Sequence, residues 1–164
     1  MAGILPLAYH NNNIYFLFGR ETMDIKYKDS GKWSDFGGSY EKDETKKETA
    51  IREGFEETMG IIGSQNDIKN LIEKKLVKRF LVNKYTTFVV KIDYDEDLPT
   101  KYKTMYENAK VNKKELVYDK KNGLYEKDEF IWMKLEDLLK HINIFRPFYK
   151  YVVKEIYYYF NKME

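Results

Sequence analysis

The sequence predicts a single α/β domain, because short β-rich apolar runs and segments with helical spacing are both distributed along one chain of 164 residues. That length suffices for one hydrophobic core. No stretch approaches about 20 uninterrupted apolar residues, so neither a transmembrane helix nor a membrane partner is expected. No repeat or low-complexity tail divides the chain, and residues 1–164 are therefore predicted to fold as one unit.

The N-terminal part is expected to form strands. Two apolar runs, 4–8 and 14–18, flank an asparagine-rich segment that tolerates turn conformations, which predicts a hairpin. A polar loop follows at 21–32. Residues 33–38, with the sequence Trp-Ser-Asp-Phe-Gly-Gly, are predicted as a short strand that runs into a glycine turn. Glycine there allows backbone amides and carbonyls to approach an ion or a phosphate.

The next segment, 45–59, has the spacing of an amphipathic helix. Its apolar side consists of Ala50, Gly54, Phe55 and Met59. Glycine inside a helix costs about 1 kcal/mol relative to alanine, so we expect Gly54 to allow close packing against a strand.

The second half of the chain alternates strands and helices around one long connection. Segment 94–127 is polar, contains several tyrosines and many lysines, and is long for a loop. It is predicted to be an insertion near the substrate, with a helix at 100–111. The other segments are predicted as strands at 76–82, 85–92 and 129–134 and as helices at 67–75, 135–142 and 148–160.

The composition limits the classes of function. The chain contains no cysteine, which excludes disulfides and thiolate catalysis and suits a reducing compartment such as the cytoplasm, or the host cytoplasm for a viral protein. The net charge is only +2, so the chain as a whole is not a general binder of polyanions. The arginines are few, and each is a candidate for recognising carboxylates or phosphates: Arg20, Arg52, Arg79 and Arg146.

Three glutamates in the 45–59 helix indicate a metal site. Glu53, Glu56 and Glu57 occupy positions i, i+3 and i+4, which share one face of a helix. Carboxylates so close together repel one another unless a cation offsets their charge, and a hard divalent ion prefers oxygen ligands. The pattern therefore predicts Mg²⁺ or Mn²⁺ beside the glycine turn, and with it phosphate chemistry.

These glutamates belong to a longer pattern over residues 38–61. The matching positions are Gly38, Glu44, Arg52, Glu53, Glu56 and Glu57. Their spacing resembles the Nudix box, G-x5-E-x7-R-E-U-x-E-E-x-G-U with U bulky and aliphatic, which is the signature of the Nudix hydrolase superfamily. Two positions depart from the family: Gly54 replaces the aliphatic U, and Gly60 comes one residue later than the pattern requires. Phe36 stands where family members usually have proline.

The resemblance implies a Nudix-type α/β/α sandwich with a mixed central sheet. It also implies metal-dependent hydrolysis of a nucleoside diphosphate linked to another group. Glu53, Glu56 and Glu57 would bind the metal ions, joined by the backbone carbonyl of Gly37. Arg52 would serve catalysis by pairing with a box carboxylate and so orienting the metal ligands.

Other roles are carried over from the same resemblance. Glu44 is the expected partner of Arg52. Family members often use a loop glutamate ahead of the late tryptophan-containing strand as the base, and Glu126 is the first choice here, with Glu129 second. Arg20, at the end of the second predicted strand, is a candidate phosphate contact.

The sequence leaves the substrate open. Nucleoside triphosphates, dinucleoside polyphosphates, ADP-ribose and nucleotide sugars form the broad group. Capped mRNA is an alternative, since some Nudix enzymes, including those of large DNA viruses, remove caps, and the lysines of 94–127 would then contact RNA. Diphosphoinositol polyphosphates are a further alternative. The non-enzymatic alternative is a Nudix module that only binds a nucleotide or a protein. Family members are often homodimers.

Overall fold

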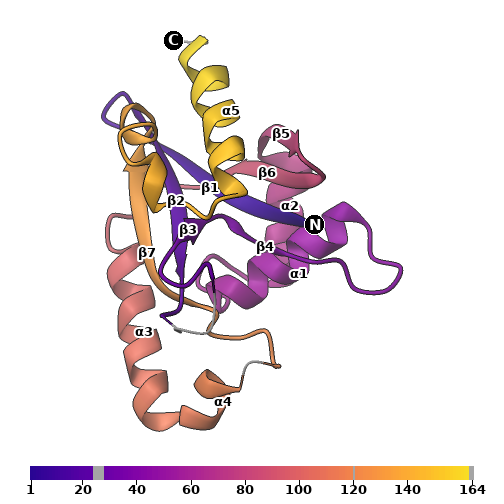
Figure 1. The fold of residues 1–164 in the computed structure, drawn as a ribbon, viewed down its shortest axis with the longest axis vertical. Coiled ribbons are helices and arrows are strands. Elements are labelled where there is room, and N and C mark those ends of the chain that lie inside the picture. The colour runs from indigo at the N-terminus through magenta and orange to yellow at the C-terminus, as the bar shows by residue number, and fades with distance from the viewer. Residues whose placement is uncertain (24–27, 120, 163–164) are drawn as a thin grey trace.

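The computed structural model describes residues 1–23, 28–119 and 121–162, which form helices on both faces of a mixed sheet (Figure 1). Its strands follow the spatial order β3-β2-β1-β6-β5, while β4 also pairs with β1 and β7 with β2. β1 and β6 run parallel, and the other pairs among the described residues are antiparallel. The strands are β1 (Ala2–His10), β2 (Asn13–Glu21), β3 (Trp33–Ser34), β4 (Phe36–Gly38), β5 (Leu76–Val82), β6 (Tyr85–Lys91) and β7 (Lys127–Lys134).

The predicted hairpin of 4–8 and 14–18 is confirmed, and the predicted strands 76–82 and 85–92 pair as a second hairpin. β1 and β2 are joined through Asn11 and Asn12, which have positive φ angles of 49° and 65°. β5 and β6 are joined through Asn83 and Lys84, with φ angles of 49° and 69°. Two consecutive left-handed residues match the right-handed twist of the flanking strands, so these short connections fix the strand registers.

The sheet separates two hydrophobic layers. Side chains of a strand alternate between faces, so Leu5 and Phe16 point toward α5 (Tyr149–Lys162). Ile4 and Leu17 contribute to the core under α1 (Lys46–Thr58) and α2 (Gln65–Lys74). In Figure 1, α5 lies on one side of the sheet and α1 and α2 on the other. The predicted α/β/α sandwich with a mixed sheet is therefore confirmed.

Helix α1 (Lys46–Thr58) follows the predicted bounds closely. Thr45 caps its N-terminus, because the Thr45 hydroxyl accepts from the Glu48 N–H and the Glu48 carboxylate accepts from the Thr45 N–H. A Cβ on Gly54 would lie 2.8 Å from Cδ1 of Ile4 in β1. The expected close packing of Gly54 against a strand is thus present, and it brings α1 directly onto β1.

The long connection is mostly helical and is attached to β7. It contains α3 (Leu98–Asn112), predicted as 100–111, and the short α4 (Lys114–Tyr118). In Figure 1, α3 runs alongside one end of β7 and leads to α4 beyond the sheet. The Tyr102 ring stacks on Phe130 of β7 at 3.8 Å between ring centroids. Helix α3 therefore extends the hydrophobic core along β7.

Two predictions are wrong. Gly37 and Gly38 lie in β4 and pair with β1, so they form part of a strand and not a turn. Segment 135–142 forms no α-helix but two 3₁₀ turns joined by a turn, Leu135–Asp137 and Ile142–Ile144. Leu135 and Leu138 are both buried, and their three-residue spacing suits the 3₁₀ repeat, in which the Leu138 N–H donates to the Leu135 carbonyl. Among the described residues, no helix combines the length and the apolar character that a membrane span requires.

Candidate metal centre

A cavity of about 530 Å³ opens beside the N-terminal end of β1, at the glycines of the neighbouring strand β4. Its walls come from segments far apart in the sequence: the end of β2, the 28–30 loop, α1, α4 with the residues ahead of β7, and the segment ahead of α5. The polar residues that line it include Glu21, Lys28, Asp29, Glu53, Glu57, Glu126 and Arg146.

Three carboxylates meet on one wall of this cavity. Glu53, Glu57 and Glu126 each offer an oxygen atom, and these atoms lie within 4.8 Å of one another. Glu53 and Glu57 are one turn apart on α1, while Glu126 comes from the connection ahead of β7. A cluster of oxygen donors alone is the ligand set that Mg²⁺ and Mn²⁺ prefer, so the residues fit the predicted ion.

The raised pKa values of these carboxylates also favour a cation at this site. Burial raises the pKa of Glu57 well above its ordinary value, and it raises the pKa of Glu53 to about 7. The pKa of Glu126 is raised mainly by burial as well. Burial and neighbouring carboxylates both disfavour the ionised form of a carboxyl group, whereas a nearby cation favours it. Their geometry therefore favours a bound cation at neutral pH.

Gly37 and Gly38 of β4 are closely surrounded by other groups. The Gly37 N–H donates to Oε1 of Glu57 at 2.7 Å and fixes that carboxylate. A Cβ on Gly38 would collide with the Glu53 carboxylate, and one on Gly37 would collide with the Tyr85 hydroxyl. That hydroxyl donates to the buried Asp35, whose pKa is raised to about 6 by burial. Both glycines are thus required by close approach.

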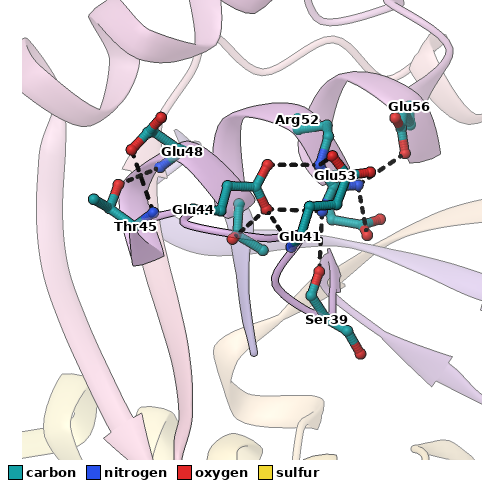
Figure 2. A network of polar contacts seen from close by, with 9 residues as sticks. Ser39, Glu41, Glu44, Thr45, Glu48, Arg52, Glu53 and Glu56 are labelled. Atoms are coloured by element: carbon teal, nitrogen blue, oxygen red, sulfur yellow. Dashed lines mark hydrogen bonds and ion pairs between the residues drawn. The ribbon is translucent and has the colours of Figure 1, made fainter.

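Arg52 is at the centre of a network of carboxylates that includes Glu53 of the cluster (Figure 2). Its Nε and Nη2 donate to the two oxygens of Glu44 at 2.8 and 3.0 Å, so the predicted pair is present. Its Nη1 donates to Glu53 at 3.1 Å and to Glu56 at 3.3 Å. The hydrogen bonds from Arg52 lower the pKa of Glu44 to about 2. Glu44 therefore keeps its charge and fixes Arg52, which in turn orients Glu53.

A second network borders the cavity, and its members Glu21, Asp29 and Arg146 line it. Lys127 is fully buried, and its Nζ donates to Oε1 of Glu21 at 2.7 Å and to the Ser34 hydroxyl at 3.0 Å. Arg146 donates to the same Glu21 oxygen at 3.2 Å and to Asp29 at 2.9 Å. Two cations thus stand close to the carboxylate cluster, and neighbouring carboxylates raise the pKa of Lys127.

Comparisons with known proteins support the fold. No family model matches the chain. The structure is similar to a C. elegans Ap4A hydrolase, with a TM-score of 0.54, 14% identity and coverage of 98% of this chain and 96% of that one. The chain has the Nudix hydrolase fold. A Nudix hydrolase from M. smegmatis is also similar, at a lower TM-score of 0.49, 10% identity and coverage of 98% and 85%.

A curated relative matches only part of the chain. An uncharacterized protein of Acanthamoeba polyphaga mimivirus is 47% identical over 58 residues, which are 35% of this chain. The match spans 18% of that relative's length.

Within this Nudix fold, the residues of the box meet as their spacing predicts, with one difference in the carboxylate cluster. Glu53 and Glu57 join Glu126, whereas Glu56 lies beside Arg52 and is not part of the three-carboxylate group. Its role as a metal ligand, like that of the Gly37 carbonyl, stays a prediction. Glu126, chosen only from the resemblance, lies at the cavity with the box glutamates.

Two other candidates lie outside the residues that line the cavity. The Nε of Arg20 donates to Asp128 at 2.7 Å, and its Nη1 lies 3.3 Å from Glu129. Both carboxylates belong to β7, which pairs with the strand of Arg20. Arg20 as a phosphate contact and Glu129 as a base therefore stay predictions without a place in the Nudix cavity.

Sequence reasoning missed the roles of Glu21, Lys127 and Arg146. The scarcity of arginine did mark Arg146 as a candidate, but no local pattern places it in the cavity. In the sequence, Lys127 is one of many lysines in segment 94–127, and nothing distinguishes it from the others. A lysine at the start of a strand gives no signal of burial, because burial depends on the acidic partner that the fold supplies.

Proposed function

We propose that this chain is a metal-dependent pyrophosphohydrolase that cleaves a diphosphate linkage in a nucleoside diphosphate compound. One observation carries the proposal: Glu53, Glu57 and Glu126 present their oxygens within 4.8 Å of one another at a cavity of about 530 Å³. A cavity of that size accommodates a small ligand such as a nucleotide.

Each residue has a role in this reaction. Glu53, Glu57 and Glu126 would hold Mg²⁺ or Mn²⁺, with Glu56 and the Gly37 carbonyl as further predicted ligands. When bound, the ion neutralises charge on the pyrophosphate oxygens and lowers the pKa of coordinated water.

The proton transfer is assigned to Glu126. A water oxygen attacks phosphorus, the bond from phosphorus to the bridging oxygen breaks, and the Glu126 carboxylate accepts the water proton. Arg52 keeps Glu53 oriented throughout. Arg146 lines the cavity and is a better candidate than Arg20 for contact with substrate phosphates.

The substrate is a nucleotide-type compound in this proposal. A dinucleoside polyphosphate comes first, because the C. elegans protein of the same fold is named an Ap4A hydrolase. Nucleoside triphosphates, ADP-ribose, nucleotide sugars and diphosphoinositol polyphosphates complete the group.

The test is product release from this panel by the purified protein with Mg²⁺ or Mn²⁺. Glu57→Gln should lower kcat at least a hundredfold, because it removes a charged oxygen donor from the cluster. Glu115→Gln, which changes an exposed carboxylate on α4, serves as the matched control and should retain full activity. No turnover on any substrate, together with a thermal shift from a nucleotide, would instead support a binding module.

Capped RNA is a second candidate. The 94–127 connection supplies Val117 and Leu124 to the cavity lining. Exposed lysines of the same connection include Lys103, Lys113, Lys114 and Lys121. Lys120 lies outside the described residues. Capped RNA therefore belongs in the panel, and a steep loss of its cleavage with added salt would indicate phosphate contacts along these lysines.

A further inference from the structure

The backbone around Glu126 is held in an unusual way. Tyr125, the preceding residue, has a φ of 57°, a left-handed conformation that a bulky side chain rarely adopts. Its side chain is nearly fully buried and packs near Tyr106 of α3. Such a conformation persists only where surrounding contacts determine it. The chain therefore enters the cavity wall at Glu126 in a fixed direction.

Two hydrogen bonds hold the peptide groups of Glu126 and Lys127. The Thr22 N–H donates to the Glu126 carbonyl at 3.0 Å. The Tyr102 hydroxyl donates to the Lys127 carbonyl at 2.5 Å, in a fully buried environment. The first bond comes from the end of β2, and the second comes from the insertion. The adjacent carbonyls of Glu126 and Lys127 are thus bonded to two different parts of the fold, which restricts the movement of this segment.

The Lys127 side chain provides a third anchor. Its aliphatic part runs so close to Gly19 that a Cβ there would lie 3.0 Å from Lys127 Cδ. Its ammonium is bonded to Glu21 and Ser34, as described above. An ammonium with no exposed surface cannot leave these partners without a large desolvation cost. Residue 127 is thus fixed inside the core while residue 126 faces the cavity.

The ring of Tyr102 is itself rigidly placed. It is stacked on Phe130 at 3.8 Å with an interplanar angle of 13°. Its hydroxyl therefore reaches the Lys127 carbonyl from a platform that belongs to β7. The insertion thus does more than border the cavity, because one of its side chains bonds the residue next to Glu126.

We propose that Tyr102 is a positioning residue that holds the Glu126 carboxylate in the cluster with Glu53 and Glu57. Its hydroxyl fixes the Lys127 carbonyl, and that peptide sets the direction of the adjoining Glu126 side chain. The catalytic consequence rests on the proposed function, in which Glu126 accepts the water proton. The consequence for cation binding does not depend on any substrate.

The experiment compares wild type with Tyr102→Phe, which removes only the hydroxyl and keeps the stacked ring. Mn²⁺ affinity is measured by electron paramagnetic resonance, and kcat is measured on the best substrate. Tyr102→Phe should weaken Mn²⁺ binding about tenfold and lower kcat by a similar factor, as expected for loss of a group that orients a ligand. In a Glu126→Gln background it should cause no further loss, because both changes act through one side chain.

Two further variants distinguish a specific effect on the position of Glu126 from a general loss of packing in the 94–127 connection. Trp132→Phe removes the bond from Trp132 Nε1 to the Asp95 carbonyl, which attaches the other end of the insertion, and it should leave Mn²⁺ affinity unchanged. Phe130→Leu weakens the stack under Tyr102 and should reduce Mn²⁺ affinity in the same direction, which provides a second variant if Tyr102→Phe folds poorly.

The outcomes distinguish this inference from the proposed function. Weaker Mn²⁺ binding in Tyr102→Phe, without hydrolysis by wild type, would support the positioning role and reject the hydrolase. Full hydrolysis by wild type with unchanged Mn²⁺ affinity and kcat in Tyr102→Phe would overturn the positioning role alone. Equal effects of Tyr102→Phe and Trp132→Phe on Mn²⁺ affinity would also overturn it.

Discussion

At the scale of single residues, Arg52 determines the charge balance at the outer side of the cavity. Its guanidinium reaches Glu44, Glu53 and Glu56 at once, and only 16% of its side chain is exposed. The two parallel bonds to Glu44 match the fork of the guanidinium, so Glu44 fixes its orientation. The other bonds then keep Glu53 in place without removing it from the cavity. A lysine in this position would supply charge but not this geometry.

Glu44→Gln should lower the free energy of unfolding by about 1–2 kcal/mol at neutral pH, because it removes a charge-assisted pair that is only partly screened by solvent. The pKa of Glu44 is lowered from 4.5 to about 2 on folding. Its contribution is therefore present above about pH 4.5 and is lost as the pH falls toward 2. Urea unfolding of both proteins across this range measures the difference.

The exposed pair of Lys47 and Glu73 provides the control for this prediction. Glu73→Gln breaks an ion pair of 2.6 Å whose side chains are 40% and 37% exposed. It should change stability little at any of these pH values, because solvent screens such pairs. A loss in Glu44→Gln that persists unchanged to about pH 2 would contradict the assigned role of the Glu44 charge.

At the scale of elements, the packing of α1 on β1 sets the position of the box glutamates. Gly54→Ala gains helix propensity of about 1 kcal/mol. The added methyl group would press on the buried Ile4, at 2.8 Å from Cδ1 and 2.9 Å from Cγ1. Overpacking of a filled core costs about 1–3 kcal/mol, so we expect a net destabilisation of about 1 kcal/mol in urea unfolding.

Ile4→Ala tests whether this contact is the cause. The shorter side chain removes both Cδ1 and Cγ1, the two atoms nearest to the added methyl group. The double variant should therefore be more stable than the sum of the two single changes predicts, by about 1 kcal/mol. Strict additivity would show that Gly54 is required for another reason.

The elements also show what the sequence can and cannot predict. Local patterns define the hairpins and α1, because asparagine turns, a capping box and helical spacing are all encoded within a few residues. Local patterns predict an α-helix at 135–142, where the structure has 3₁₀ turns. The three-residue spacing of the buried Leu135 and Leu138 is compatible with both kinds of helix, so it does not distinguish them. Local patterns could not place Lys127 against Glu21, because that contact joins residues 106 positions apart and arises from strand pairing. The place of Glu126 came from resemblance and not from local physics.

At the scale of the whole molecule, folding gathers like charges into one cavity. Glu21, Glu57 and Glu126 come from β2, α1 and the segment ahead of β7, and Arg146 comes from the segment ahead of α5. Lys127 and Arg146 offset part of the negative charge from one side, and Arg52 does so from another. These cations compensate part of the carboxylate charge, and we expect a bound divalent ion to stabilise the fold further.

This balance predicts a pH-dependent effect of divalent ions on stability. Folding raises the pKa of Glu53 from 4.5 to about 7, so the native state holds protons that the unfolded chain has lost. Stability from this source is full below about pH 4.5 and is lost as the pH rises through about 7. Mg²⁺ competes with those protons, so it should stabilise the protein more at about pH 8 than at about pH 5.5.

The measurement is the thermal midpoint with saturating Mg²⁺ or with a chelator at both pH values. An ion at about 100 times its Kd adds about 2.7 kcal/mol, which corresponds to a rise of roughly 5–10 °C for a chain of this size. We expect that rise at about pH 8, and at most half of it at about pH 5.5. The Glu53→Gln, Glu57→Gln double variant should show no Mg²⁺ effect at either pH, because two of the three clustered carboxylates are then neutral. A Mg²⁺ effect that is equal at both pH values in wild type would place the ion away from this cluster.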